Sequence, residues 1–131
     1  MPFALALTVV LFVLAVFQLA LALGAPFGRF AWGGQHRVLP RRLRIGSLIS
    51  IVIYAVIAVI ALDRVGAIDV LPDTFAVIAM WVVFAYFAVG IFLNAVSRSK
   101  PERYVMVPVT IVLTVLSFFI AMGFGVLAAP A

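Results

Sequence analysis

The sequence predicts an all-α integral membrane protein, a four-helix bundle that forms a single transmembrane domain over residues 1–131. Two observations predict it. Of the 131 residues, 68% are hydrophobic and 10% are charged, whereas a soluble domain carries about 25% charged residues. The apolar residues also form four long runs, each close to the roughly 20 residues that a helix needs to cross about 30 Å of hydrocarbon. A bilayer is therefore the expected solvent.

The four runs are too long for strands and are separated by segments that hold charges, prolines and glycines. A helix satisfies its own backbone groups in lipid, so each run is expected to be a spanning helix. The expected spans cover about 4–23, 45–62, 75–93 and 105–128.

The fourth helix has the clearest start signal. Ser99 and Glu102 have the spacing of a capping box, in which the two side chains satisfy the free backbone donors of a first helical turn. Pro101 lies between them and suits a first turn. We therefore expect helix from near Lys100, ahead of the apolar run itself.

The first run has a second interpretation as a cleaved secretory signal. The stretch "LALGAP", residues 21–26, offers the small residues that such a cleavage needs. A signal begins with a positively charged segment, and Met1-Pro2-Phe3 has no side-chain charge. The run is also longer than a typical signal core, so a spanning helix is the expectation and the signal the open alternative.

Basic residues predict the orientation. Eight of the nine lie in the first and third loops, which share a side of the membrane in a four-span protein. Lys and Arg favour the cytoplasmic side. We therefore expect loops one and three in the cytoplasm, both termini outside, and a bacterial plasma membrane as the location. The first loop holds Arg29, Arg37, Arg41, Arg42 and Arg44, the second Arg64, and the third Arg98, Lys100 and Arg103.

The basic segments are expected to contact anionic lipid headgroups, not nucleic acid. They are short and lie between apolar runs, which is typical of a topology signal. Long side chains near a helix end extend toward the phosphates. The expected lipid contacts are Arg37, Arg41, Arg42 and Arg44. In loop two, Asp63 and Arg64 are expected to form an exposed pair.

Several kinds of chemistry find no support in the sequence. The chain has no cysteine and one histidine, so neither a thiol site nor a metal site with several ligands is predicted. No ionisable residue lies near the middle of a run, which argues against a proton-coupled pump and separates the chain from small multidrug transporters. We predict no catalytic residue, cofactor or metal, and leave open whether the chain is an enzyme.

Uncharged polar residues inside the spans form a candidate cluster. At helical spacing each set shares one face, and at 1.5 Å per residue most lie in the half nearer loops one and three. We expect them to face the bundle interior. They either pack the helices together, at about 0.6 kcal/mol per bond, or line a polar pocket open to the cytoplasm. The members are Gln18, Ser50, Tyr54, Tyr86, Asn94, Thr110 and Thr114.

Loop one carries the segment "WGGQHR", residues 32–37, which is the candidate roof of such a pocket. Its roof residues are Trp32, Gln35 and His36. The alternative is a loop that lies against the membrane, with Trp32 as an interfacial anchor. The glycine pair permits a tight turn in either case.

The segments "AWGGQHRVLPRRLRIGS" and "NAVSRSKPERYVMVPV" give the chain a resemblance to small uncharacterised four-span membrane proteins of high-GC bacteria. The resemblance implies the topology and no activity. Two functions follow from the residues as hypotheses. One is a non-enzymatic accessory or interaction subunit, whose partner is another membrane protein or a second copy of the chain. The alternative is a small binding or permeation protein for a neutral or anionic solute or lipid headgroup.

The orientation is testable with reporter fusions. We expect a fusion at Ala131 to report an external location and fusions within residues 33–38 a cytoplasmic one, because basic loops stay inside. Paired phosphatase and fluorescent-protein reporters measure this. The opposite result at both places would contradict the orientation.

Overall fold

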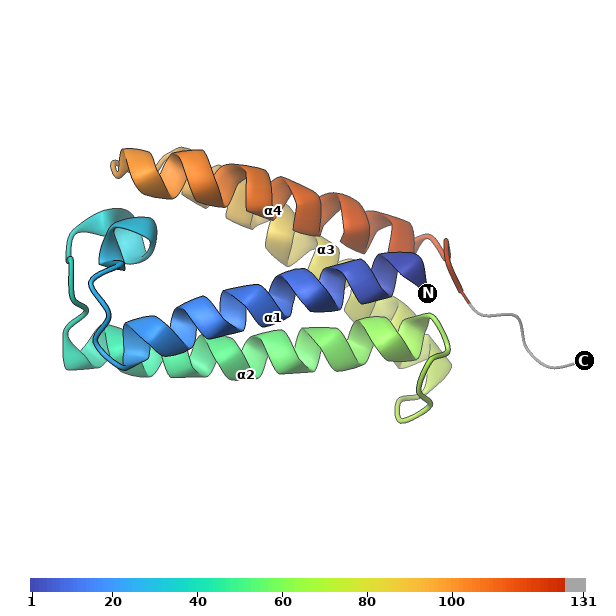
Figure 1. The fold of residues 1–131 in the computed structure, drawn as a ribbon. Coiled ribbons are helices and arrows are strands. Elements are labelled where there is room, and N and C mark those ends of the chain that lie inside the picture. Colours follow the sequence, from blue (N-terminus) through green and yellow to red (C-terminus); the bar gives the residue numbers. More distant parts are fainter. Residues whose placement is uncertain (127–131) are drawn as a thin grey trace, which may run out of the picture.

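The computed structural model describes residues 1–126, which form an all-α bundle with no strand among those residues (Figure 1). All four predicted helices are confirmed, and each is long and apolar enough to cross a membrane. Two short 3-10 turns lie in loop one, which covers residues 23–40. The helices are α1 Pro2–Ala22, α2 Arg41–Arg64, α3 Asp73–Ala95 and α4 Lys100–Ala121, and the turns are η1 Gly28–Phe30 and η2 Trp32–Gly34.

The helices form two antiparallel hairpins. α1 packs mainly on α2, and α3 packs mainly on α4, while smaller α1–α4 and α2–α3 contacts join the pairs. Figure 1 shows the start of α4 lying apart from the α1–α2 pair at the end that bears loop one, with the 3-10 turns between them. The N-terminus and the end of α4 lie at the opposite end.

The main apolar core lies in the half of the bundle away from loop one. All four helices contribute to it, and Leu7, Met80 and Ile120 have no exposed surface. A second, smaller cluster joins Leu21 at the end of α1 to Leu39 in loop one. Tight packing is thus concentrated at one end of the bundle, with the loop attached to the helices at the other.

The start of α4 follows the prediction, with one difference in its hydrogen bonds. The Ser99 hydroxyl oxygen accepts the Glu102 N–H at 3.4 Å. The carboxylate of Glu102 does not reach back to the Ser99 N–H directly. Instead the Ser97 hydroxyl accepts that N–H at 3.2 Å and donates to Glu102 at 2.7 Å. The Ser97 hydroxyl therefore bridges the Glu102 carboxylate and the Ser99 N–H, in place of the direct bond of a capping box.

The expected fourth span is too long at its C-terminal end. α4 ends at Ala121, and Gly123 follows in the left-handed region with φ of 94°. The Gly123 N–H donates to Ile120 and the Phe124 N–H to Phe119, which is a Schellman motif that closes the helix. Residues 127 and 128 of the expected span lie outside the described residues.

The predicted exposed pair of Asp63 and Arg64 is wrong. Asp63 is buried, and its carboxylate accepts the backbone N–H groups of Val70 and Leu71, both at 2.8 Å. Arg64 instead donates to the carbonyl oxygen of Ala121 at 3.2 Å, at the end of α4. Both side chains therefore bind backbone groups that have no partner inside their own helix or loop, and they do not bind each other.

Asp63 provides a stability test. Replacing Asp63 with Ala leaves two loop amides without their charged acceptor, so we expect a loss on the order of 2 kcal/mol in the free energy of unfolding. Denaturant unfolding in mixed micelles measures it. Asp69→Ala is the matched control, because Asp69 is an exposed acidic residue of the loop whose amides Asp63 binds. Equal effects of the two substitutions would contradict the role given to Asp63.

Candidate functional site

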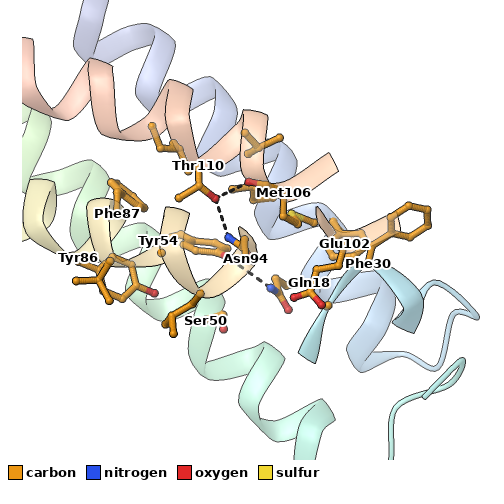
Figure 2. A pocket seen from close by; sticks show the side chains of 18 of the residues that line it. Gln18, Phe30, Ser50, Tyr54, Tyr86, Phe87, Asn94, Glu102, Met106 and Thr110 are labelled. Carbon is orange, nitrogen blue, oxygen red and sulfur yellow. Dashed lines mark hydrogen bonds between the residues drawn. The ribbon is translucent and has the colours of Figure 1, made fainter. Parts of the chain in front are cut away.

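A cavity of about 690 Å³ occupies the half of the bundle nearer loop one. All four long helices and loop one contribute to its wall, which is mainly apolar. Figure 2 shows polar side chains from α1, α2, α3 and α4 around it. The polar and amphipathic lining residues are Gln18, Trp32, Ser50, Tyr54, Tyr86, Asn94, Glu102 and Thr110.

The structure brings most of the predicted polar cluster to this cavity. Thr114 is the one predicted member outside the lining. It is buried farther along α4, where its hydroxyl donates to the Thr110 carbonyl oxygen at 2.7 Å. The six that line the cavity are Gln18, Ser50, Tyr54, Tyr86, Asn94 and Thr110.

Gln18 joins α1 to α2 inside the cavity. Its side-chain N–H donates to the hydroxyl oxygen of Tyr54 at 3.3 Å (Figure 2). The residue is 9% exposed, and its amide oxygen Oε1 is buried without a hydrogen-bond partner among residues 1–126. A buried acceptor without a donor costs about 1–3 kcal/mol. Gln18 therefore holds unused hydrogen-bonding capacity at the cavity wall.

A second chain of hydrogen bonds joins α3 to α4. The Asn94 amide nitrogen donates to the Thr110 hydroxyl oxygen at 2.8 Å, and the Thr110 hydroxyl donates to the Met106 carbonyl oxygen at 2.6 Å (Figure 2). Gly90 lies beside this contact, since a Cβ there would be 3.2 Å from a Thr110 methyl group. The polar side chains therefore join the two helices within each hairpin, and they also line a cavity.

Tyr86 differs from the expected interior position. Its side chain is 52% exposed, although it lines the cavity. Val82, Val89 and Leu93 share its helical face, line the cavity as well, and are also exposed. Exposed side chains on a cavity wall mark its mouth. The cavity therefore opens sideways along α3, facing Ser50 and Tyr54 of α2, and does not open solely at the loop end.

Trp32, one of the three residues predicted for the roof, belongs to the wall of the cavity. Its indole N–H donates to Ser47 of α2 at 3.2 Å, and its ring lies against Gly46, where a Cβ would be 2.8 Å from two ring carbons. The Trp32 backbone adopts φ of 53°, which is unfavourable for a bulky residue. The contacts with Gly46 and Ser47 compensate for that strain.

The other two predicted roof residues do not line the cavity. Gln35 is exposed and His36 is partly buried, and neither belongs to the wall. Phe30 and Ala31 line the cavity instead. The turn at Trp32 and Gly33 changes the chain direction, so the residues before it face the cavity.

Loop one is attached to loop three as well as to α2. The Ser99 hydroxyl donates to the Arg29 carbonyl oxygen at 2.6 Å. Gly34 packs against the same serine, since a Cβ at Gly34 would be 2.3 Å from Ser99 Cβ. Within the loop, the Gly28 N–H donates to the Arg37 carbonyl oxygen at 2.8 Å. The first and third loops therefore lie together at one end of the bundle.

The four arginines expected to contact lipid differ in position. Arg37, Arg41 and Arg42 are exposed at the loop end. Arg44 is partly buried and donates through Nε to the Leu39 carbonyl oxygen at 2.8 Å, with its guanidinium against Gly24. Arg44 thus holds the loop, and three arginines stay free to approach lipid phosphates.

Glu102 is a cavity residue that the sequence reasoning missed. It is 8% exposed and lines the cavity from the first turn of α4. The capping-box spacing suggested a purely structural role. One sequence feature could have predicted the cavity position of Glu102: it lies eight residues before Thr110, so both residues share one face of α4.

The described residues contain no group of three or more His, Cys, Asp or Glu side chains that could hold a metal ion. Comparison of the chain with protein-family models, with curated proteins and with solved structures finds no match.

The Trp32 contact is testable by fluorescence. The chain has two tryptophans, so Trp81→Phe leaves Trp32 as the single emitter. In that background we expect Gly46→Val to displace the indole, because there is no space for a side chain at Gly46, and to shift its emission to longer wavelength. Ile49→Phe adds bulk on the exposed face of α2 and should leave the emission unchanged. A shift in neither variant would contradict the packing of Trp32 on Gly46.

Proposed function

We propose that this chain is an integral membrane protein that binds an amphipathic molecule in the cavity, and that the ligand enters sideways from the lipid between α2 and α3. The observation that carries the proposal is the shape of the site. A cavity of about 690 Å³ lies within the range of roughly 300–1,000 Å³ for small-molecule sites. Its mouth is lined by exposed apolar side chains of α3, and buried polar groups lie inside.

The distribution of polar groups favours an amphiphile over other ligands. A fully polar solute would leave its own groups against apolar walls without partners. A fully apolar molecule would leave the Gln18 amide oxygen and the Glu102 carboxylate unsatisfied, which costs free energy. A molecule with an alkyl portion and one polar end satisfies both parts of the site.

The membrane setting of the proposal rests on the helices and the charges. The four apolar helices support membrane embedding by length and composition. We place loops one and three in the cytoplasm of a bacterial plasma membrane, since these loops and the helix starts that follow them carry eight of the nine basic residues. Arg37, Arg41 and Arg42 then approach anionic headgroups. The polar end of the cavity, near Glu102 in the first turn of α4, lies close to the headgroup level of that leaflet.

The accessory-subunit hypothesis remains a prediction. No specific feature of residues 1–126 favours another membrane protein or a second copy of the chain as the partner. Binding of an amphiphile is compatible with such a role, and the two hypotheses need separate experiments.

The proposed site is tested by filling it. We expect Ser50→Phe to place a ring in the cavity and to weaken saturable binding of a monoacylglycerol probe by about tenfold or more, because the ring and the alkyl chain compete for the same space. Native mass spectrometry from lipid nanodiscs measures the bound probe per chain. Val52→Phe is the matched control, since Val52 is exposed on α2 and does not line the cavity. Equal binding by both variants would contradict the site.

A further inference from the structure

The polar end of the cavity contains two side chains with free hydrogen-bond acceptor capacity, Gln18 and Glu102. The Gln18 oxygen Oε1 is buried and has no partner among residues 1–126. The Glu102 carboxylate has one recorded side-chain donor within those residues, the Ser97 hydroxyl. Figure 2 shows the Gln18 amide and the Glu102 carboxylate at the same end of the cavity. A carboxylate has about four acceptor positions, so much of its capacity is free.

Several donors of this region already have acceptors, although each side-chain amide uses one of its two N–H groups. The Trp32 indole N–H binds Ser47, the Asn94 amide nitrogen binds Thr110, and the Gln18 amide nitrogen binds Tyr54. The guanidinium of Arg103, next to Glu102 in the chain, donates to the Ser97 carbonyl oxygen at 3.1 Å. The exposed arginines of loop one do not line the cavity. Within residues 1–126, the second amide N–H groups of Gln18 and Asn94 and the hydroxyls of Tyr54 and Tyr86 donate no hydrogen bond. The wall therefore presents neutral donors as well as acceptors, and Glu102 is the one acidic side chain among the described lining residues.

Glu102 is the acidic residue of this acceptor site, and it has little access to water. The residue is 8% exposed and forms its recorded side-chain bond with a neutral hydroxyl. A carboxylate removed from water is costly unless a cation and further donors satisfy it. A cationic group delivered by the ligand would supply both.

We propose that the cavity selects an amphiphile whose polar end is a primary ammonium group. This inference rests on the proposed function and specifies its ligand class. An ammonium carries three N–H donors, which match the free capacity of Glu102 and the unpartnered oxygen of Gln18. This ligand class differs from the neutral or anionic solute or lipid headgroup that was the alternative predicted from the sequence. The structure keeps the exposed arginines of loop one outside the wall and presents a carboxylate inside it, so an anionic headgroup would meet a like charge.

Three single-chain probes that share a dodecyl tail test the inference: dodecylammonium, dodecanol and dodecanoate. We expect dodecylammonium to bind at least about tenfold more tightly than dodecanol, since hydrogen bonds to a charged group are stronger than neutral ones. Dodecanoate should bind most weakly. Native mass spectrometry from nanodiscs of zwitterionic lipid gives the three affinities without a competing surface charge.

Two substitutions test which side chains bind the ammonium group of the ligand. Glu102→Gln keeps an oxygen for the Ser97 hydroxyl and removes the charge, so dodecylammonium should lose about tenfold in affinity while dodecanol is little changed. Gln18→Met removes the unpartnered oxygen at similar size and should weaken dodecylammonium by several fold. It also serves as the second variant if Glu102→Gln does not fold. Val52→Phe should alter none of the affinities.

The outcomes separate the two claims. One outcome is that Ser50→Phe abolishes binding of all three probes while the unsubstituted protein binds them with equal affinity or binds dodecanoate best. In that case the cavity is a binding site and the ammonium inference fails. The inference also fails if both Glu102→Gln and Gln18→Met leave dodecylammonium binding unchanged. If no probe shows saturable binding sensitive to Ser50→Phe, the proposed function fails, and the inference with it.

Discussion

The placement of loop one between the two helical hairpins is the constraint on which the rest of this structure depends. The loop is bonded to α2 through Trp32 and Ser47 and to loop three through Arg29 and Ser99. It therefore occupies space that helix side chains would otherwise fill, and the hairpins pack tightly in the opposite half. The cavity is the volume left beneath the loop. Glycines at the contact points allow this approach, since a side chain at Gly46 would collide with the Trp32 ring.

Much of the fold was predictable because bilayer physics leaves few choices. Long apolar runs must be helices, and the Ser99–Glu102 spacing correctly placed the start of α4. The end of α4 was not predictable from hydropathy, because Gly123 stops the helix by backbone geometry inside an apolar run. The burial of Asp63 was also missed. The Asp63 carboxylate accepts hydrogen bonds from backbone N–H groups seven and eight residues later in the chain. This contact depends on the path of the loop, which a periodic sequence pattern does not predict.

The site was predictable in its helical part and less so in its loop part. Helical spacing grouped Tyr54 and Asn94 with polar neighbours on their own helices, and depth along the helix added Gln18; all three line the cavity. The exposure of Tyr86 depends on how far α2 and α3 separate, which periodicity does not report. The roof was only partly correct, since a positive φ at Trp32 reverses the loop and turns His36 away from the wall. Glu102 was missed because a cap and a cavity residue have the same sequence signature.

The central claim, an open and lipid-facing cavity beneath loop one, is tested most directly by nitroxide collision measurements in a bilayer. The chain has no cysteine, so single labels at Ser50, Val52 and Leu11 report the cavity wall, the outer face of α2 and the packed core. We predict that the Ser50 label collides with oxygen nearly as often as the Val52 label and rarely with a water-soluble nickel chelate. The Leu11 label, at a position that is 2% exposed, should collide with neither. A Ser50 label as inaccessible as the Leu11 label, or one reached mainly by the nickel chelate, would contradict the account.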